Sequence, residues 1–146
     1  MKEIVELLKE EITYFKKLKS ALGEIHGHIH SLAVGVAQTH LASKHTKVRS
    51  WKISAKYGKG IDIVGRDTKG KTVVAAEVKT TARSEKKSLG SQQRTKVRED
   101  LEKLLAVNAK YKYFFIIDNK NRKSIETIMK NLDRSNSIDL INVFEC

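Results

Sequence analysis

The chain has 146 residues, and its 29 Lys and Arg against 17 Asp and Glu give a formal net charge of +12. This length is typical of a single domain, residues 1–146, and so large a positive charge favours a polyanionic partner, with nucleic acid as the first candidate. No apolar run approaches the roughly 18 residues of a membrane span, no signal peptide is visible, and the lone Cys146 cannot form an internal disulfide, so we expect a cytoplasmic protein without a membrane partner.

The N-terminal part of the chain predicts two helices. Apolar residues recur at helical spacing through residues 2–20, with Lys and Glu between them, and again through residues 24–43. We expect Gly23 to separate the two, which gives an N-terminal helical hairpin. The first helix, within residues 1–22, is expected either to cover the domain or to meet a partner chain.

Three strands are predicted after the helices. Residues 51–57 alternate between apolar and polar side chains, as a half-buried strand does. Residues 60–65 and 73–81 are rich in β-branched and apolar residues, and the turn-like residues 66–71 lie between them. The last two strands are therefore expected to form a hairpin.

Charged residues in this hairpin need an explanation, because charges are rarely buried without a partner or a metal. A two-residue loop at Lys69 and Gly70 would set Asp62 directly opposite Glu77, and a four-residue loop would set it diagonal to Glu77. Strand side chains alternate between faces, so either loop places Asp62, Glu77 and Lys79 on one face. A loop of three or five residues, or a bulge, would instead place Asp62 on the face of the sheet opposite to Glu77 and Lys79.

The remaining elements predict an α/β fold. In chain order they are a polar loop over 80–91, a helix over 92–109, a strand over 113–117 buried on both faces, a helix around 123–133 and a strand around 138–144. The last three form a βαβ unit, for which a right-handed parallel crossover is expected. We therefore expect a mixed β-sheet with helices packed on it.

Asp62 on one strand and Glu77-Val78-Lys79 on the next resemble the signature of the PD-(D/E)XK nuclease superfamily. The proline that usually precedes the Asp is replaced by Ile61. The resemblance covers most of residues 24–117. It implies a restriction-endonuclease-like or Holliday-junction-resolvase-like fold and a metal-dependent DNA endonuclease.

The resemblance also implies roles for these residues. Asp62, Glu77 and the backbone carbonyl of Val78 would bind Mg²⁺, with Mn²⁺ able to replace it, and carboxylate ligands suit such a hard cation. Lys79 would contact the scissile phosphate and position the attacking water. The alternative is a surface ion pair between Glu77 and Lys79, which would contribute little. The apolar residues around them favour the catalytic interpretation.

Two further residues are candidates by the same resemblance. Glu24 could be the glutamate that many members place on the helix before the first strand, or only an acid favoured by the helix dipole. Gln93 could be the glutamine often found near the site, or an exposed residue of the first helical turn. His26 and His30, four residues apart, could share zinc, although a packing role is commoner.

Basic residues flank the proposed site and are candidates for phosphate contacts. They are Lys56, Lys59, Arg83, Lys86, Lys87, Arg94 and Lys96, with Lys44, Lys47 and Arg49 in the loop before the first strand. Two nicks require two sites, so a homodimer is a further expectation. Two other functions stay open: a catalytically inactive nucleic-acid-binding protein on the same scaffold, and an interaction protein that docks an acidic partner.

Overall fold

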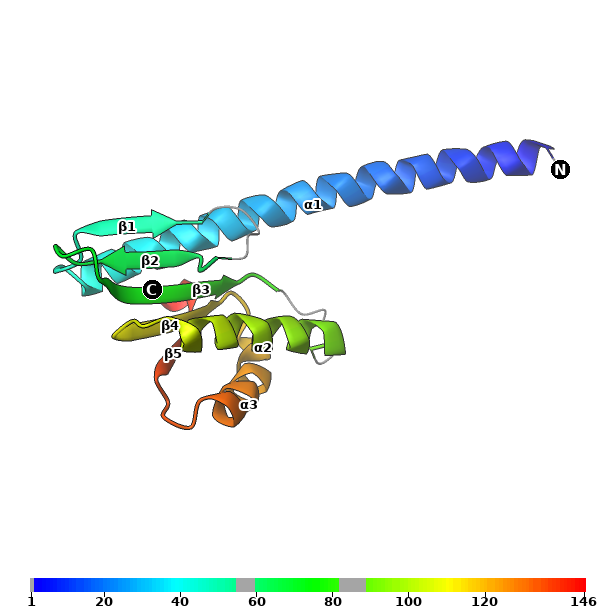
Figure 1. Ribbon diagram of the computed structural model, residues 1–146. Helices are drawn as coiled ribbons and strands as arrows, with labels where there is room; N and C mark the ends of the chain where they lie inside the picture. The colour runs from blue at the N-terminus through cyan, green and yellow to red at the C-terminus, as the bar shows by residue number, and fades with distance from the viewer. Residues whose placement is uncertain (1, 55–59, 82–88) are drawn as a thin grey trace.

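The computed structural model describes residues 2–54, 60–81 and 89–146, with the backbone alone for residues 2–9. These residues form an α/β fold with a five-stranded mixed sheet in the order β1-β2-β3-β4-β5 (Figure 1). The strands are β1 (Ser50–Ile53), β2 (Ile63–Arg66), β3 (Thr72–Lys79), β4 (Tyr111–Ile116) and β5 (Ile138–Asn142). The first three pair antiparallel, and β4 and β5 continue the sheet parallel to β3. The predicted hairpin and the parallel βαβ unit are thereby confirmed.

The expected N-terminal helical hairpin is wrong, because α1 (Lys2–Lys44) is one continuous helix. Gly23 lies inside it, in open space where a β-carbon would have nothing within 4 Å. A glycine costs a helix only about 1 kcal/mol relative to alanine, and the apolar spacing continues in phase on both sides of it. All side chains from Glu10 to Leu22 are exposed, so this part of α1 does not cover the sheet.

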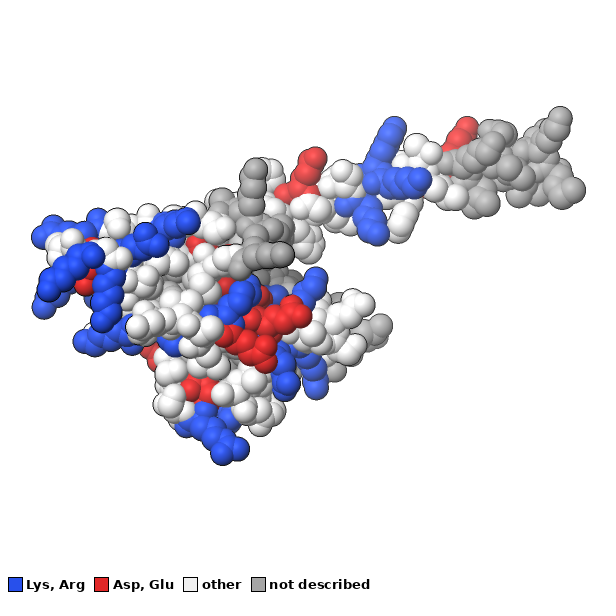
Figure 2. Space-filling view, viewed as in Figure 1, with Lys and Arg blue, Asp and Glu red and all other residues white. Residues whose placement is uncertain are grey.

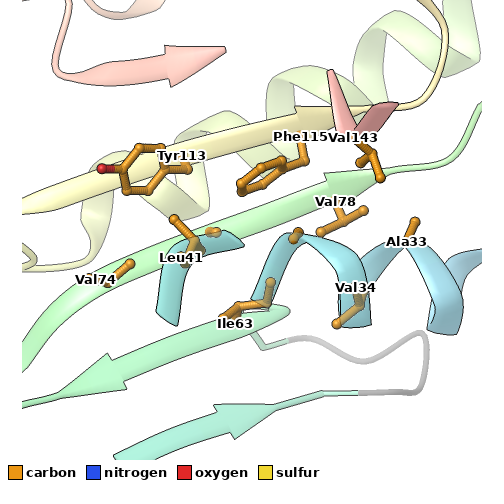
Figure 3. Close-up of a cluster of buried hydrophobic side chains, with 11 residues drawn as sticks. Ala33, Val34, Leu41, Ile63, Val74, Val78, Tyr113, Phe115 and Val143 are labelled. Atoms are coloured by element: carbon orange, nitrogen blue, oxygen red, sulfur yellow. The ribbon is translucent and has the colours of Figure 1, made fainter. Parts of the chain in front are cut away.

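Helices pack on both faces of the sheet. The C-terminal half of α1 covers one face, and Figure 3 shows Leu41 among Val74, Tyr113 and Phe115 in that core. On the other face lie α2 (Ser91–Ala106), which follows β3, and α3 (Arg122–Leu132), which follows β4. Phe114 belongs to this second core, so β4 is buried on both faces, as its continuous apolar run predicts. No helix among the described residues is long and apolar enough to cross a membrane.

The β2–β3 hairpin has neither the two-residue nor the four-residue loop that would by itself place Asp62 and Glu77 on the same face of the sheet. Its loop is the three residues 68–70, closed by the Asp67 N–H donating to the Lys71 carbonyl at 3.0 Å, with Gly70 at φ +75°. A three-residue loop ending in a left-handed residue is a common hairpin form. The register then shifts between Gly65 and Arg66, and Val73 is the unpaired residue. The odd loop and the bulge each reverse the parity once, so their effects cancel.

Candidate functional site

Asp62 and Glu77 lie close together at the carboxyl end of β3. The register Ile63↔Ala76, continued by one residue, sets Asp62 opposite Glu77. The Asp62 carboxylate accepts a hydrogen bond from the Val78 N–H at 2.9 Å, and a further hydrogen bond links it to the Glu77 side chain. Both residues are buried, with 9% and 4% of their surface exposed. The hairpin thus brings together the two acids that the sequence singles out.

The pKa values of the two carboxyl groups are shifted in opposite directions. Burial, followed by the charge of Asp62 and the hydrogen bond to it, raises the pKa of Glu77 to about 9. Burial would also raise the pKa of Asp62, but the nearby His30 ring, the hydrogen bond from the Val78 N–H and the interaction with Glu77 outweigh it and lower that pKa. At neutral pH Asp62 is therefore ionised and Glu77 is protonated, the arrangement expected when like charges share a confined site.

Lys79 is held by an acid on α2 rather than by Glu77. Its Nζ lies 2.9 Å from Asp100 Oδ2, and Lys103 Nζ lies 2.9 Å from Asp100 Oδ1. Lys103 also reaches Glu77 Oε1 at 3.4 Å. Burial would lower the pKa of Lys103, but Asp100 and Glu77 outweigh it and raise the pKa. Asp100 therefore joins Lys79 of β3 to Lys103 of α2 by ion pairs, and Lys103 extends the network to Glu77.

Glu24 of α1 does not reach this network, but a histidine of the same helix does. His30 Nε2 lies 3.6 Å from Asp62 Oδ1, and His30 is 6% exposed. Glu24 is exposed and begins about 9 Å further along the helix axis, at 1.5 Å per residue. His26 is exposed as well, so it does not share the buried environment of His30. Gln93 is exposed in the first turn of α2.

The expected phosphate-binding residues fall into two groups. Arg94 and Lys96 are exposed on α2, and Arg94 lines a cavity of about 700 Å³ together with Arg98 and Lys123. The other predicted contacts near the site lie outside the described residues. They are Lys56, Lys59, Arg83, Lys86 and Lys87.

Charge is unevenly spread over the face drawn in Figure 2. An acidic patch lies over the middle of α2, where Glu99, Asp100 and Glu102 follow in the sequence. Lys and Arg gather at the other end of the sheet, beside the β2–β3 turn. A cavity of about 340 Å³ at that end is lined by Lys44, Lys47, Lys110 and Tyr111, among others. The Lys110 ammonium lies 5.0 Å from the centre of the Tyr111 ring, within the range of a cation–π contact.

The donor chemistry of the acid pair suits magnesium. Mg²⁺ can bind through one or two carboxylates and take its other ligands from water and phosphate, so Asp62 and Glu77 are the residues that would hold it. Zinc in a structural site needs four nitrogen or sulfur ligands. Among the described residues, no group of three or more His, Cys, Asp or Glu side chains could hold a metal ion of any kind, so a cation here would have only the two carboxylates as side-chain ligands. Val78 donates its N–H to Asp62, and its carbonyl remains a predicted ligand.

Three residues of the network were not among the candidates drawn from sequence for this site: Asp100, Lys103 and His30. On α2 the signal is present, since Asp100 stands three residues after the buried Val97 and therefore borders the apolar stripe. His30 likewise belongs to the docked face of α1, beside Ala33 and Val34. In each case the partner across the interface comes from a distant part of the chain, which spacing alone does not reveal.

In comparisons with known proteins, no family model, no curated protein and no solved structure matches the chain.

Proposed function

We propose that the chain is a Mg²⁺-dependent DNA endonuclease with a restriction-endonuclease-like arrangement of its site. One observation supports this above all: Asp62 and Glu77 meet at the carboxyl end of a central strand, buried and linked by a hydrogen bond. The carboxyl ends of strands are the usual place for ligands in α/β sheets. A pair of acids with opposite pKa shifts is also a mark of functional sites.

The residues would divide the work of phosphodiester hydrolysis. Asp62 is ionised and oriented by the Val78 N–H, so it is ready to bind a cation. Glu77 must lose its proton to become the second ligand. When bound, Mg²⁺ supplies Lewis-acid polarisation of the phosphate and a more acidic water. Lys79, anchored by Asp100 at 2.9 Å, supplies a positive charge of fixed position for the scissile phosphate.

The test is a nicking assay on supercoiled plasmid and branched DNA with Mg²⁺, Mn²⁺ or EDTA. We expect metal-dependent cutting by the wild-type chain, lost in Asp62→Asn and in Lys79→Ala. The matched controls are Asp139→Asn, an exposed acid of β5, and Lys71→Ala, an exposed lysine before β3. Cutting that survives in Asp62→Asn, or that is lost equally in the controls, would rule out the proposed site.

A second function, nucleic-acid binding without catalysis, is favoured by the cavity around Lys44, Lys47, Lys110 and Tyr111. It lies at the amino ends of β3 and β4, about 20 Å from Lys79 at 3.3 Å per strand residue. Cations beside an aromatic ring suit phosphates and bases. Binding measured in EDTA distinguishes the two functions. Salt-sensitive affinity that falls in Lys47→Glu but not in Asp62→Asn, without any cutting, supports the second function alone.

A further inference from the structure

The N-terminal half of α1 extends away from the sheet (Figure 1). From this half into the part that packs on the sheet, α1 carries large apolar side chains that its own domain does not bury. Seven of them, which we call the α1 seam, are between 40% and 73% exposed. They are Phe15, Leu18, Leu22, Ile25, Ile29, Leu32 and Val36. Large exposed apolar surfaces mark interaction sites, and long helices owe most of their stability to packing of an apolar face.

The spacing of the α1 seam identifies the kind of contact it makes. The intervals between its members are three, four, three, four, three and four residues. This alternation is the a/d pattern of a coiled coil, and it extends over about 32 Å of helix at 1.5 Å per residue. The face that docks on the sheet is a different one, formed by residues such as Val34, Ala37 and Leu41. The helix therefore has one apolar face that its own domain buries and another that stays exposed.

We infer that this second helix is the α1 of another copy of the chain, paired parallel and in register. Two of the a positions are the β-branched Ile29 and Val36, and two of the three d positions are Leu18 and Leu32, the combination that favours parallel two-stranded coiled coils; Leu22 at a and Ile25 at d have the reverse order.

Charge also permits the pairing of two identical helices. Residues 10–36 contain three Lys and three Glu, so this stretch has no net charge although the chain has +12. In a parallel pair each g residue faces the e residue of the next heptad, and the exposed pairs are Tyr14–Lys19 and Ala21–His26, whereas the next e residue, Ala33, is buried against its own sheet. No pair joins like charges, so the contact between the helices adds no like-charge pair at its edges. The pairing is independent of the proposed nuclease activity, and it would hold two candidate sites at the same end of one stalk.

Light scattering of the full chain after size exclusion, in the absence of DNA, tests this inference. We expect twice the 16.5 kDa mass of the chain. The double variant Leu22→Glu, Ile25→Glu should have the monomer mass, and Ser20→Glu, exposed outside the seam, should remain a dimer. Fluorescence of Trp51, the only tryptophan, checks that the domain stays folded in each variant. A monomeric wild-type chain across a dilution series, a larger oligomer, or a double variant that remains a dimer would overturn the inference.

Orientation is tested by disulfide trapping in a Cys146→Ser background. Leu18→Cys should cross-link to itself under mild oxidation, because a parallel pair in register sets each d position against its own counterpart. Lys17→Cys, on the outward face, should not cross-link. In an antiparallel pair residue 18 would meet a different residue, so the absence of a Leu18→Cys cross-link in a dimeric sample refutes the parallel arrangement.

Discussion

Asp62 and Glu77 share a hydrogen bond across the β2–β3 hairpin although the hairpin has an odd loop, because the bulge at Val73 restores the parity. The three-residue loop and the bulge each reverse which face Asp62 occupies, and together they return it to the face of Glu77. Burial favours the neutral form of Glu77, whereas a bound cation requires the ionised form, so the free energy of deprotonating Glu77 weakens cation binding.

Glu77→Gln is expected to stabilise the metal-free protein at alkaline pH. The folded pKa of about 9 lies above the ordinary 4.5, so Glu77 contributes stability that is complete below about pH 4.5 and is lost as the pH rises through about 9. The loss has an upper limit of about 1.4 kcal/mol per pH unit. Gln stays neutral, so urea unfolding in EDTA should show the variant more stable near pH 8, with a difference that shrinks towards pH 5. Glu102→Gln, exposed on α2, should show no such trend, and an equal trend in both variants contradicts the assignment.

Magnesium is expected to raise the melting temperature, and more so at about pH 8 than at about pH 6, because Glu77 must release a proton before it binds the cation. Saturation at about 100 times the dissociation constant corresponds to about 2.7 kcal/mol of stabilisation. Differential scanning fluorimetry with Mg²⁺, then with excess EDTA, measures the shift and its reversal. Asp62→Asn should abolish the shift and Asp139→Asn should preserve it. A shift of the same size in Asp62→Asn would place the cation elsewhere.

Asp100→Asn is expected to reduce both stability and cutting. Asp100 binds Lys79 and Lys103 at 2.9 Å each, and these partly buried pairs together contribute about 1 kcal/mol to the free energy of unfolding. Without Asp100 the Lys79 ammonium loses its fixed position, so the turnover rate should fall more than the affinity for DNA. Chemical denaturation and nicking kinetics measure the two effects. Glu99→Gln removes the same charge from the adjacent exposed position and should change neither.

Gly65→Ala is expected to destabilise the sheet by about 1–3 kcal/mol, the usual cost of overpacking. A β-carbon at Gly65 would lie 2.9 Å from a ring atom of Trp51 and 3.0 Å from Val48. Gly35→Ala is the matched control, because nothing lies within 4 Å of its β-carbon and alanine in a helix gains about 1 kcal/mol. Thermal unfolding followed by Trp51 fluorescence should therefore give opposite signs for the two variants. A neutral Gly65→Ala would show that Trp51 can move aside.

Periodicity was sufficient to predict most of the elements. The run Tyr113–Ile117 predicts a strand buried on both faces, and β4 is one, because alternate side chains meet helices on opposite sides of the sheet. The prediction of a helical hairpin failed for a local reason. A single glycine has a small energetic effect, and the continuous apolar spacing around Gly23 outweighs it.

The amino-acid sequence by itself determined the α/β class, the hairpin and the identity of the two acids, because these depend on the period of apolar residues and on rare charges within apolar runs. Only the tertiary structure decided that Asp62 faces Glu77, since the face on which Asp62 lies depends on the loop length and on a bulge, and their two reversals cancel. The tertiary structure likewise places Lys79 beside Asp100 and Asp62 beside His30. These partners lie 21 and 32 residues apart in the chain, and packing of helices on the two faces of the sheet brings them within contact distance.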